Sequence, residues 1–197
     1  MLSITLVILF RGGSAVPAKK QISKEKILEV AIDIIRKNGA NAVNARNIAK
    51  SLKCSTQPIY LSFSGMDELK TAVTQEAIGI YRTFISEEMS NSEYPPYKSF
   101  GMGYIRFAQK EKELFQFLFM RDRSKEKERE FNEMLFLLTD NNKTDYETAY
   151  KIHMEMWLFG HGIATMLATS YITLDEETIS NYMSDVYQGV RLLYDTK

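Results

Sequence analysis

The sequence has few of the residues that metal sites and disulfides require, and few prolines that would interrupt a helix. It contains one cysteine, two histidines and four prolines in 197 residues. A lone cysteine, Cys54, cannot form an intramolecular disulfide, which fits a reducing compartment. Structural zinc sites use four Cys or His ligands, and His153 and His161 would lie ~12 Å apart along a helix axis. We therefore expect neither a metal ion nor a cofactor.

Catalytic motifs and long apolar runs are also lacking. We find no paired nucleophile and base, no phosphate-binding glycine loop and no metal-ligand spacing, so we do not expect an enzyme. The apolar run of residues 1–10, MLSITLVILF, is far shorter than the ~20 residues of a transmembrane helix. No basic residue precedes it and no small-residue cleavage site follows. We interpret residues 1–20 as a leader or arm, or as a non-native start, with a signal peptide as the alternative. We expect a cytoplasmic protein without membrane contact.

The pattern that is present is helical. Few breakers and many Leu, Ile, Met, Lys and Glu residues favour an all-helical chain, and no strand-like alternation of useful length occurs. The predicted fold class is therefore all-α. The expected helices span residues 24–38, 45–52, 56–62, 66–89, 97–108, 111–120, 127–139, 145–169 and 175–194.

Residues suited to helix N-caps precede the first three of these helices: Ser23, Asn44 and Ser55. Asn38-Gly39 is a suitable end for the first helix. If Ser55 is the cap, Pro58 is the third helical residue, where its missing N–H would have no partner within the helix in any case.

The formal net charge is zero, but the charge is unevenly distributed. Residues 1–63 hold ten basic and three acidic residues, a net charge of +7, and the remainder carries −7. A basic module of this size suits a polyanionic partner. A solvated charged surface would give the same count, so charge alone does not decide between the two.

The stretch from Ser23 to Glu76 resembles the N-terminal DNA-binding domain of the TetR (tetracycline-repressor-like) family of transcriptional regulators. The resemblance rests on an ordered set: ILEVAIDIIRKNGANAVNARNIAKSL, Ser55-Thr56, Ile59-Tyr60, Phe63 and the DEL triplet at 67–69. It implies a helix-turn-helix domain over residues 21–65, whose recognition helix enters the major groove. It also implies a larger helical domain for effector binding and dimerisation over residues 66–197.

The resemblance assigns a role in DNA binding to seven residues: Asn44, Arg46, Lys53, Ser55, Thr56, Gln57 and Tyr60. Asn44 and Arg46 are expected at phosphates. Thr56 and Gln57 are expected at base edges, where Gln57 could bond adenine with two hydrogen bonds. Tyr60 would contact the DNA backbone or a thymine methyl group, unless it is a packing residue.

Other residues near the recognition helix have expected roles too. Phe63 matches the buried aromatic residue that anchors this helix. Lys19, Lys20 and Lys24 would form an arm toward phosphate or the minor groove, or a basic leader.

Several positions depart from the family's usual pattern. Lys53 stands where the turn usually has glycine, so we expect a left-handed backbone conformation there. Gln57 and Pro58 replace small residues. Ser62 stands where histidine is frequent, and Met66 where a phosphate-contacting lysine is frequent. These departures concern contacts to DNA more than the fold.

The C-terminal segments YIRFAQKEKELFQFLF and WLFGHGIATML resemble a subgroup that carries a Trp-x-x-x-His-Gly element, here Trp157, His161 and Gly162. An effector pocket is predicted from large apolar and flexible residues: Tyr104, Phe107, Phe119, Met154, Trp157 and His161. The same residues would also suit an ordinary helical core. The helices near 145–169 and 175–194 are expected to pair with their copies in a homodimer.

The predicted function is a repressor that binds a pseudo-palindromic double-stranded DNA operator as a homodimer. A small, largely apolar effector would release it by favouring a conformation with mismatched recognition helices. Two alternatives remain: a helical partner-binding module, and a DNA-binding regulator that has no small-molecule effector.

Overall fold

The computed structural model of the chain describes residues 22–122, 134–139 and 144–195. Every regular element in these residues is a helix, which confirms the all-α prediction. The expected leader and its lysines, Lys19 and Lys20, lie outside the described residues.

A small N-terminal unit is formed by four elements: α1 (Lys24–Asn38), the 3-10 helix η1 (Ala40–Ala42), α2 (Ala45–Ser51) and α3 (Gln57–Ser62). The Ser23 hydroxyl caps α1 by accepting a hydrogen bond from the Lys26 N–H at 3.2 Å. Gly39 ends the helix with φ of 76°, a conformation that suits glycine. Both ends of α1 therefore confirm the prediction.

The body is built from five helices: α4 (Met66–Ser90), α5 (Pro96–Lys110), α6 (Lys112–Phe119), α8 (Tyr146–Ala168) and α9 (Glu176–Asp195). Each bound lies within two residues of the expected one. Of the helix predicted at 127–139, residues 134–139 are described and are helical. The rest of that prediction lies outside the described residues.

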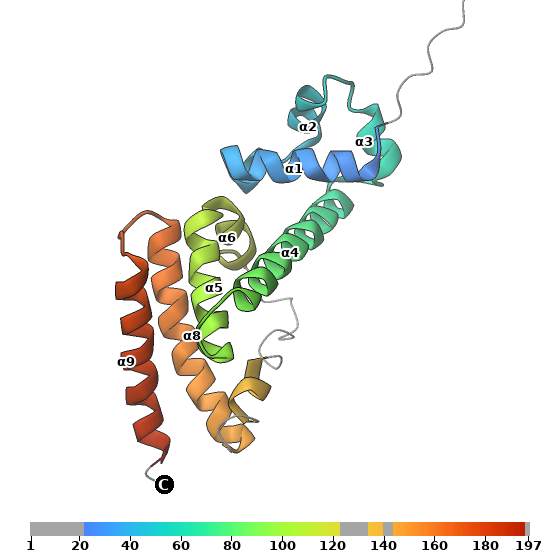
Figure 1. Cartoon of the computed structure of the whole chain (residues 1–197). Coiled ribbons are helices and arrows are strands. Elements are labelled where there is room, and N and C mark those ends of the chain that lie inside the picture. Colours follow the sequence, from blue (N-terminus) through green and yellow to red (C-terminus); the bar gives the residue numbers. More distant parts are fainter. Residues whose placement is uncertain (1–21, 123–133, 140–143, 196–197) are drawn as a thin grey trace, which may run out of the picture.

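Figure 1 shows how these helices are arranged. The long helix α4 leads from the N-terminal unit into the body, where α5 packs between α4 and α8, and α9 flanks α8. A continuous apolar core runs from Ile27 and Ile35 in α1, through Val73 in α4, to Ile152 in α8. Because α1 also packs on α6, the N-terminal unit is held to the body at two places.

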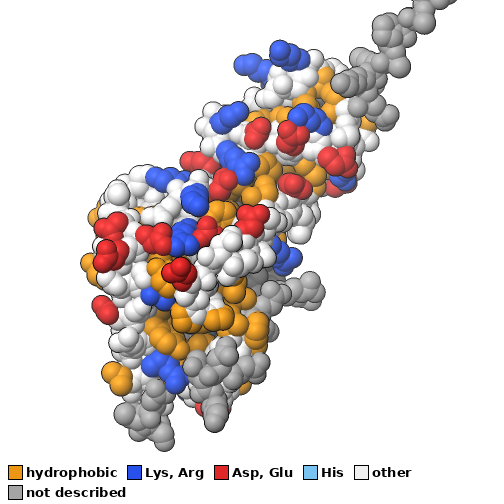
Figure 2. Space-filling model, viewed as in Figure 1, with side chains coloured by type: hydrophobic (Ala, Val, Ile, Leu, Met, Phe, Trp, Pro, Cys, Tyr) orange, Lys and Arg blue, Asp and Glu red, His pale blue; other side chains and the backbone are white. Residues whose placement is uncertain are grey.

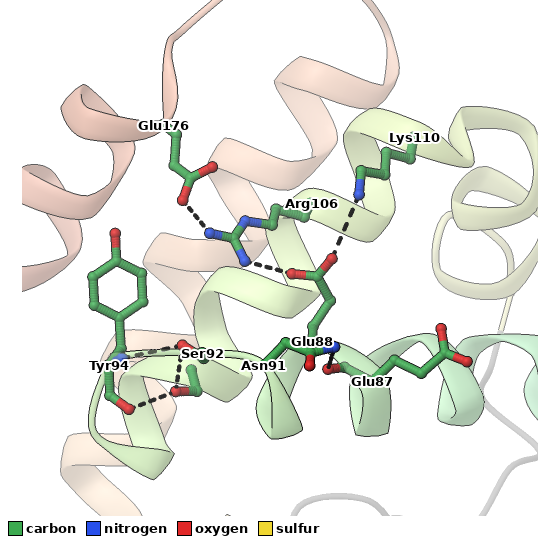
Figure 3. Close-up of polar contacts among 9 residues, drawn as sticks. Glu87, Glu88, Asn91, Ser92, Tyr94, Arg106, Lys110 and Glu176 are labelled. Atoms are coloured by element: carbon green, nitrogen blue, oxygen red, sulfur yellow. Dashed lines mark hydrogen bonds and ion pairs between the residues drawn. The ribbon is translucent and has the colours of Figure 1, made fainter.

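Polar contacts reinforce the attachment of α1 and the packing of the body. The Arg36 guanidinium donates two hydrogen bonds to the Glu111 carboxylate, at 2.9 and 2.8 Å, and so ties the end of α1 to the α5–α6 corner. Within the body, Arg106 of α5 pairs with Glu88 of α4 and with Glu176 of α9, as Figure 3 shows. Burial alone would lower the pKa of Arg106, but the two carboxylates raise it above its ordinary value.

No helix in the described part of the chain is long and apolar enough to cross a membrane.

Candidate nucleic-acid interface

The turn between α2 and α3 is a Schellman motif, which explains its unusual backbone. The Cys54 N–H donates to the Ala49 carbonyl at 3.0 Å, and the Lys53 N–H donates to the Lys50 carbonyl at 3.2 Å. This pattern places the residue after the helix cap in the left-handed region. Lys53 accordingly has φ of 52°, as predicted.

Helix α3 starts differently from the expectation. The N-cap is Thr56 rather than Ser55, and no side chain caps the helix. Pro58 is therefore the second helical residue, not the third, a position at which its missing N–H still has no helical partner. The sequence predicted the wrong N-cap because Ser55 and Thr56 are both good capping residues, and local sequence does not decide which of them caps α3. Ser55 is instead exposed on the turn.

The end of α3 is held by the buried Phe63 ring and by polar contacts among Lys24, Ser64 and Glu68, which we call the latch. Phe63 is 2% exposed, and the Lys24 ammonium lies 4.6 Å from its ring centroid. Glu68 accepts hydrogen bonds from both the N–H and the hydroxyl of Ser64, at 2.7 Å each, and lies 3.5 Å from Lys24. These Ser64 hydrogen bonds are the main reason that the pKa of Glu68 is lowered.

The latch corrects the expectation for Lys24. This residue is the first of α1, and its half-exposed side chain contacts Phe63 and Glu68. It is not part of a free arm. Sequence could not show this, because the partners lie about forty residues away along the chain.

The outer face of α2, the turn and α3 carries polar groups that have no partner among the described residues. Arg46, Lys53 and Gln57 are exposed and form no side-chain hydrogen bond or ion pair with another described residue. Lys50, which the sequence analysis did not select, shares these properties. Its position four residues after Arg46 could have identified it, because that spacing places both bases on one side of α2.

The aromatic pair of α3 divides as predicted. Tyr60 is 54% exposed and Phe63 is buried. Leu61 is 79% exposed, an apolar side chain that the sequence analysis also missed. A helix only six residues long presents little surface, so Tyr60 and Leu61 make up much of its apolar outer face.

Two of the seven residues expected to bind DNA, Asn44 and Thr56, are less available for contacts outside the protein. The Asn44 amide caps α2 by accepting from the Asn47 N–H at 2.9 Å, and it donates to the Ala42 carbonyl at 3.3 Å. Thr56 is partly buried at the start of α3. We therefore expect Arg46, Lys53, Gln57 and Tyr60 to contribute more to any contact than Asn44 or Thr56.

The charge of this face has one sign. No acidic residue occurs between Asp33 and Asp67, so Arg46, Lys50 and Lys53 are not neutralised by sequence neighbours. Figure 2 shows basic side chains gathered at the outer end of the N-terminal unit, with acidic side chains lower on the same view. A polyanion approaching this end meets positive charge first.

The left-handed lysine leads to a prediction about stability. Lys53→Gly should raise the free energy of unfolding by about 1 kcal/mol, because a side chain in the left-handed region costs roughly 1–2 kcal/mol. Lys53→Ala is the matched control, since it removes the same ammonium and keeps the strained backbone. Urea unfolding at fixed protein concentration measures both. Equal stability of the two variants would contradict the strain.

The residues predicted for an effector pocket lie mostly together in the body. The Tyr104 hydroxyl and His161 Nδ1 are 2.8 Å apart, and Trp157 stacks on His161 with ring centroids 5.2 Å apart. Phe119 meets Tyr104 edge-on at 5.2 Å. Phe107 is fully buried against Tyr81 and Phe84, and Met154 is partly buried on α8.

The two histidines occupy separate polar contacts. His153 is buried, and its Nδ1 lies 3.0 Å from the Tyr97 hydroxyl. Burial lowers the pKa of His153, so the ring is neutral near pH 7. His161 pairs with Tyr104 instead. Within the described residues, no group of three His, Cys, Asp or Glu side chains could hold a metal ion.

The arrangement of helices is similar to that of a known protein. The crystal structure of a TetR-like transcriptional regulator from Rhodococcus sp. RHA1 superposes with a TM-score of 0.61 and 16% sequence identity, over 84% of this chain and 91% of that chain. No protein-family model and no curated protein matches the sequence. At this identity the similarity concerns the fold. The chain therefore has the fold of a TetR-like transcriptional regulator, as its N-terminal motifs predict.

Proposed function

We propose that this protein is a sequence-specific DNA-binding transcriptional regulator. The observation that carries the proposal is the outer face of α2, the turn and α3, where Arg46, Lys53 and Gln57 are exposed and have no partner among the described residues. Other bases of the same unit, such as Lys26 and Arg36, are paired with carboxylates. Exposed cations together with a free amide are what phosphate contacts and base-edge readout require.

A gel shift against genomic fragments, repeated across salt concentrations, tests the proposal. We expect a sequence-selective complex that unlabelled DNA of the same sequence displaces. Its affinity should fall as the salt concentration rises, because each phosphate contact releases a counterion. A complex that ignores sequence, or has no salt dependence, would count against specific DNA binding. The partner-binding alternative predicts no such complex.

Gln57 and Arg46 should affect operator binding in different ways. Gln57→Ala is expected to cost ~1–3 kcal/mol on the preferred operator and little on a sequence changed at the base that it reads. Arg46→Ala should weaken all sequences alike and reduce the salt slope by about one. Binding isotherms on matched and mismatched operators measure both. If the two variants behave identically, the division into base and phosphate contacts is wrong.

We further propose that the protein binds its operator as a homodimer through α8 and α9. Large apolar side chains are exposed on both helices, among them Leu158 on α8 and Tyr182 and Leu193 on α9. Gly162 and Gly189 have open space where a side chain would stand, which would let a second helix approach closely. Two copies related by a two-fold axis would read two half-sites in successive major grooves.

Leu158→Glu and Leu193→Glu should each shift the protein toward the monomer. A carboxylate buried at an apolar interface has no partner there, so we expect at least a tenfold loss of operator affinity, about 1.4 kcal/mol. Tyr171→Glu is the control, because Tyr171 is also a large exposed side chain, at 80%, but follows the end of α8. Sedimentation velocity measures the oligomeric state. Monomers in all three variants, or in none, would contradict an α8–α9 interface.

A small, largely apolar effector is proposed to bind near Tyr104, Trp157 and His161. This cluster offers apolar rings together with a few polar atoms, as small-molecule sites usually do. Binding would release DNA if the effector prefers the conformation with mismatched recognition helices. Trp157 is the chain's only tryptophan, so its fluorescence reports on this cluster directly. If no apolar compound both changes this emission and lowers operator affinity, the alternative of a regulator without an effector is favoured.

A further inference from the structure

A cavity of about 280 Å³ lies where the N-terminal unit meets the body. Its lining comes from both parts. Ile35 of α1 and Ala40 of η1 form one side, and Val73 of α4 and Phe117 of α6 form the other. None of the residues predicted for the effector pocket is among its described lining residues, so the cavity is separate from the Tyr104–His161 cluster.

The lining is apolar inside and cationic at two places. Ile35, Val43 and Val73 are buried aliphatic side chains, and Phe117 is partly buried beside them. Two bases, Lys70 and Arg121, also line the cavity, and no acidic side chain does so among the described residues. Lys70 is exposed and has no ion pair with a described residue.

This combination selects a class of ligand. Small-molecule sites usually have volumes of roughly 300–1,000 Å³, so a cavity at the lower limit accepts only a small molecule. Its apolar walls favour a short hydrocarbon or a single ring. The exposed ammonium of Lys70 favours a carboxylate, because hydrogen bonds between ionised groups are the stronger ones.

We infer that the junction cavity is a second regulatory site, which binds a small organic carboxylate and changes the orientation of the DNA-binding unit relative to the body. The hydrocarbon part lies against Ile35, Val73 and Phe117, and the carboxylate lies at Lys70. The proposal that a ligand binds is argued from the lining of the cavity alone. The regulatory step rests on the proposed DNA-binding function.

The coupling follows from the position of the walls. The affinity of a ligand that contacts both α1–η1 and α4–α6 depends on the angle between the N-terminal unit and the body. In this structure the Arg36–Glu111 pair and the packing of α1 on α6 fix that angle. The affinity for DNA depends on the same angle, because this angle determines where α3 lies in a dimer. If the ligand prefers one angle, the affinities for ligand and operator are linked and must change by the same factor.

Benzoate is a suitable probe, with benzyl alcohol as the uncharged control of the same shape. Methyl NMR of the full-length protein without DNA should show benzoate-dependent shifts at Ile35, Val43 and Val73. Benzyl alcohol should bind roughly tenfold more weakly, because a charged hydrogen bond is lost. Shifts centred elsewhere, or equal binding of the two probes, would overturn the carboxylate site.

Two variants test the residues. Lys70→Gln should weaken benzoate binding roughly tenfold and leave benzyl alcohol unchanged, whereas Lys37→Gln, which removes a nearby charge outside the lining, should change neither. Ala40→Phe should fill the cavity from its exposed rim and remove binding of both probes. Unaltered methyl signals from the body identify a folded Ala40→Phe protein. Unchanged benzoate affinity in either Lys70→Gln or Ala40→Phe would overturn the site.

The regulatory step has its own readout. Benzoate affinity is measured for the free protein and for the protein saturated with operator. A difference between the two is expected, and equal affinities would overturn the coupling. In Ala40→Phe, which should bind no benzoate, benzoate should leave the operator affinity unchanged. If the wild type binds no operator at all, the proposed DNA-binding function fails while the NMR result for the cavity still stands.

Discussion

Replacing Phe63 by alanine is expected to lower the free energy of unfolding by about 3–5 kcal/mol, the usual cost of removing a buried phenylalanine. The side chain is 2% exposed and sits directly after α3. Its removal leaves a cavity beneath a helix of six residues, which is too short to be stable without tertiary packing. Helix α3 should therefore lose its fixed position, and the proposed operator binding should be lost with it.

Leu61→Ala is the matched control for this experiment. Leu61 lies on the same helix, two residues earlier, but is 79% exposed, so its removal should change stability by less than about 0.5 kcal/mol. Urea unfolding followed by circular dichroism, at one fixed protein concentration, measures both variants. Similar losses for Phe63→Ala and Leu61→Ala would mean that Phe63 does not anchor α3.

Arg106→Met is expected to lower the free energy of unfolding by about 2 kcal/mol, between the values for exposed and for buried ion pairs, because the Arg106–Glu88 pair is partly buried. Arg106 lies between Glu88 of α4 and Glu176 of α9 (Figure 3). The Glu88 side chain is only 17% exposed. Methionine keeps the apolar stem of the arginine but leaves the Glu88 carboxylate with Lys110 alone, at 3.5 Å.

Two further variants distinguish the effect of the unpaired Glu88 carboxylate from the effect of lost packing. Lys110→Met removes a mostly exposed partner of Glu88 and should cost less than about 1 kcal/mol. The double variant Arg106→Met with Glu88→Leu should recover much of the stability, because replacing both charges by apolar groups is often nearly neutral. A double variant as unstable as Arg106→Met alone would show that the loss comes from packing and not from an unpaired carboxylate.

The local features of the N-terminal unit could be predicted from short stretches of sequence. Ser23 and Asn44 cap their helices as expected, and Lys53 adopts the expected left-handed conformation. Each of these depends on hydrogen bonds between residues within a few positions of one another. Ser55 is the exception, because the adjacent Thr56 competes for the same position and the structure places the cap there.

Long-range partners could not be predicted in the same way. The sequence shows that Lys24, Arg36 and Arg106 are basic, but not that Glu68, Glu111 and Glu88 are the acids that meet them. Composition contains 25 basic and 25 acidic residues, and any of the acids could in principle be the partner. This is why Lys24 was expected in an arm toward DNA and is found in a latch instead.

The sequence by itself determined the helical fold, the helix-turn-helix unit and its positive charge, because periodicity, capping residues and net charge are properties of neighbouring residues. Only the tertiary structure decided which polar side chains are used internally and which remain on the outer face of α2 and α3. It also decided that a cavity lies between Ile35 and Phe117, residues eighty-two positions apart. The physical reason is that side chains distant in sequence meet only when the helices pack, and packing depends on the shape of the whole core.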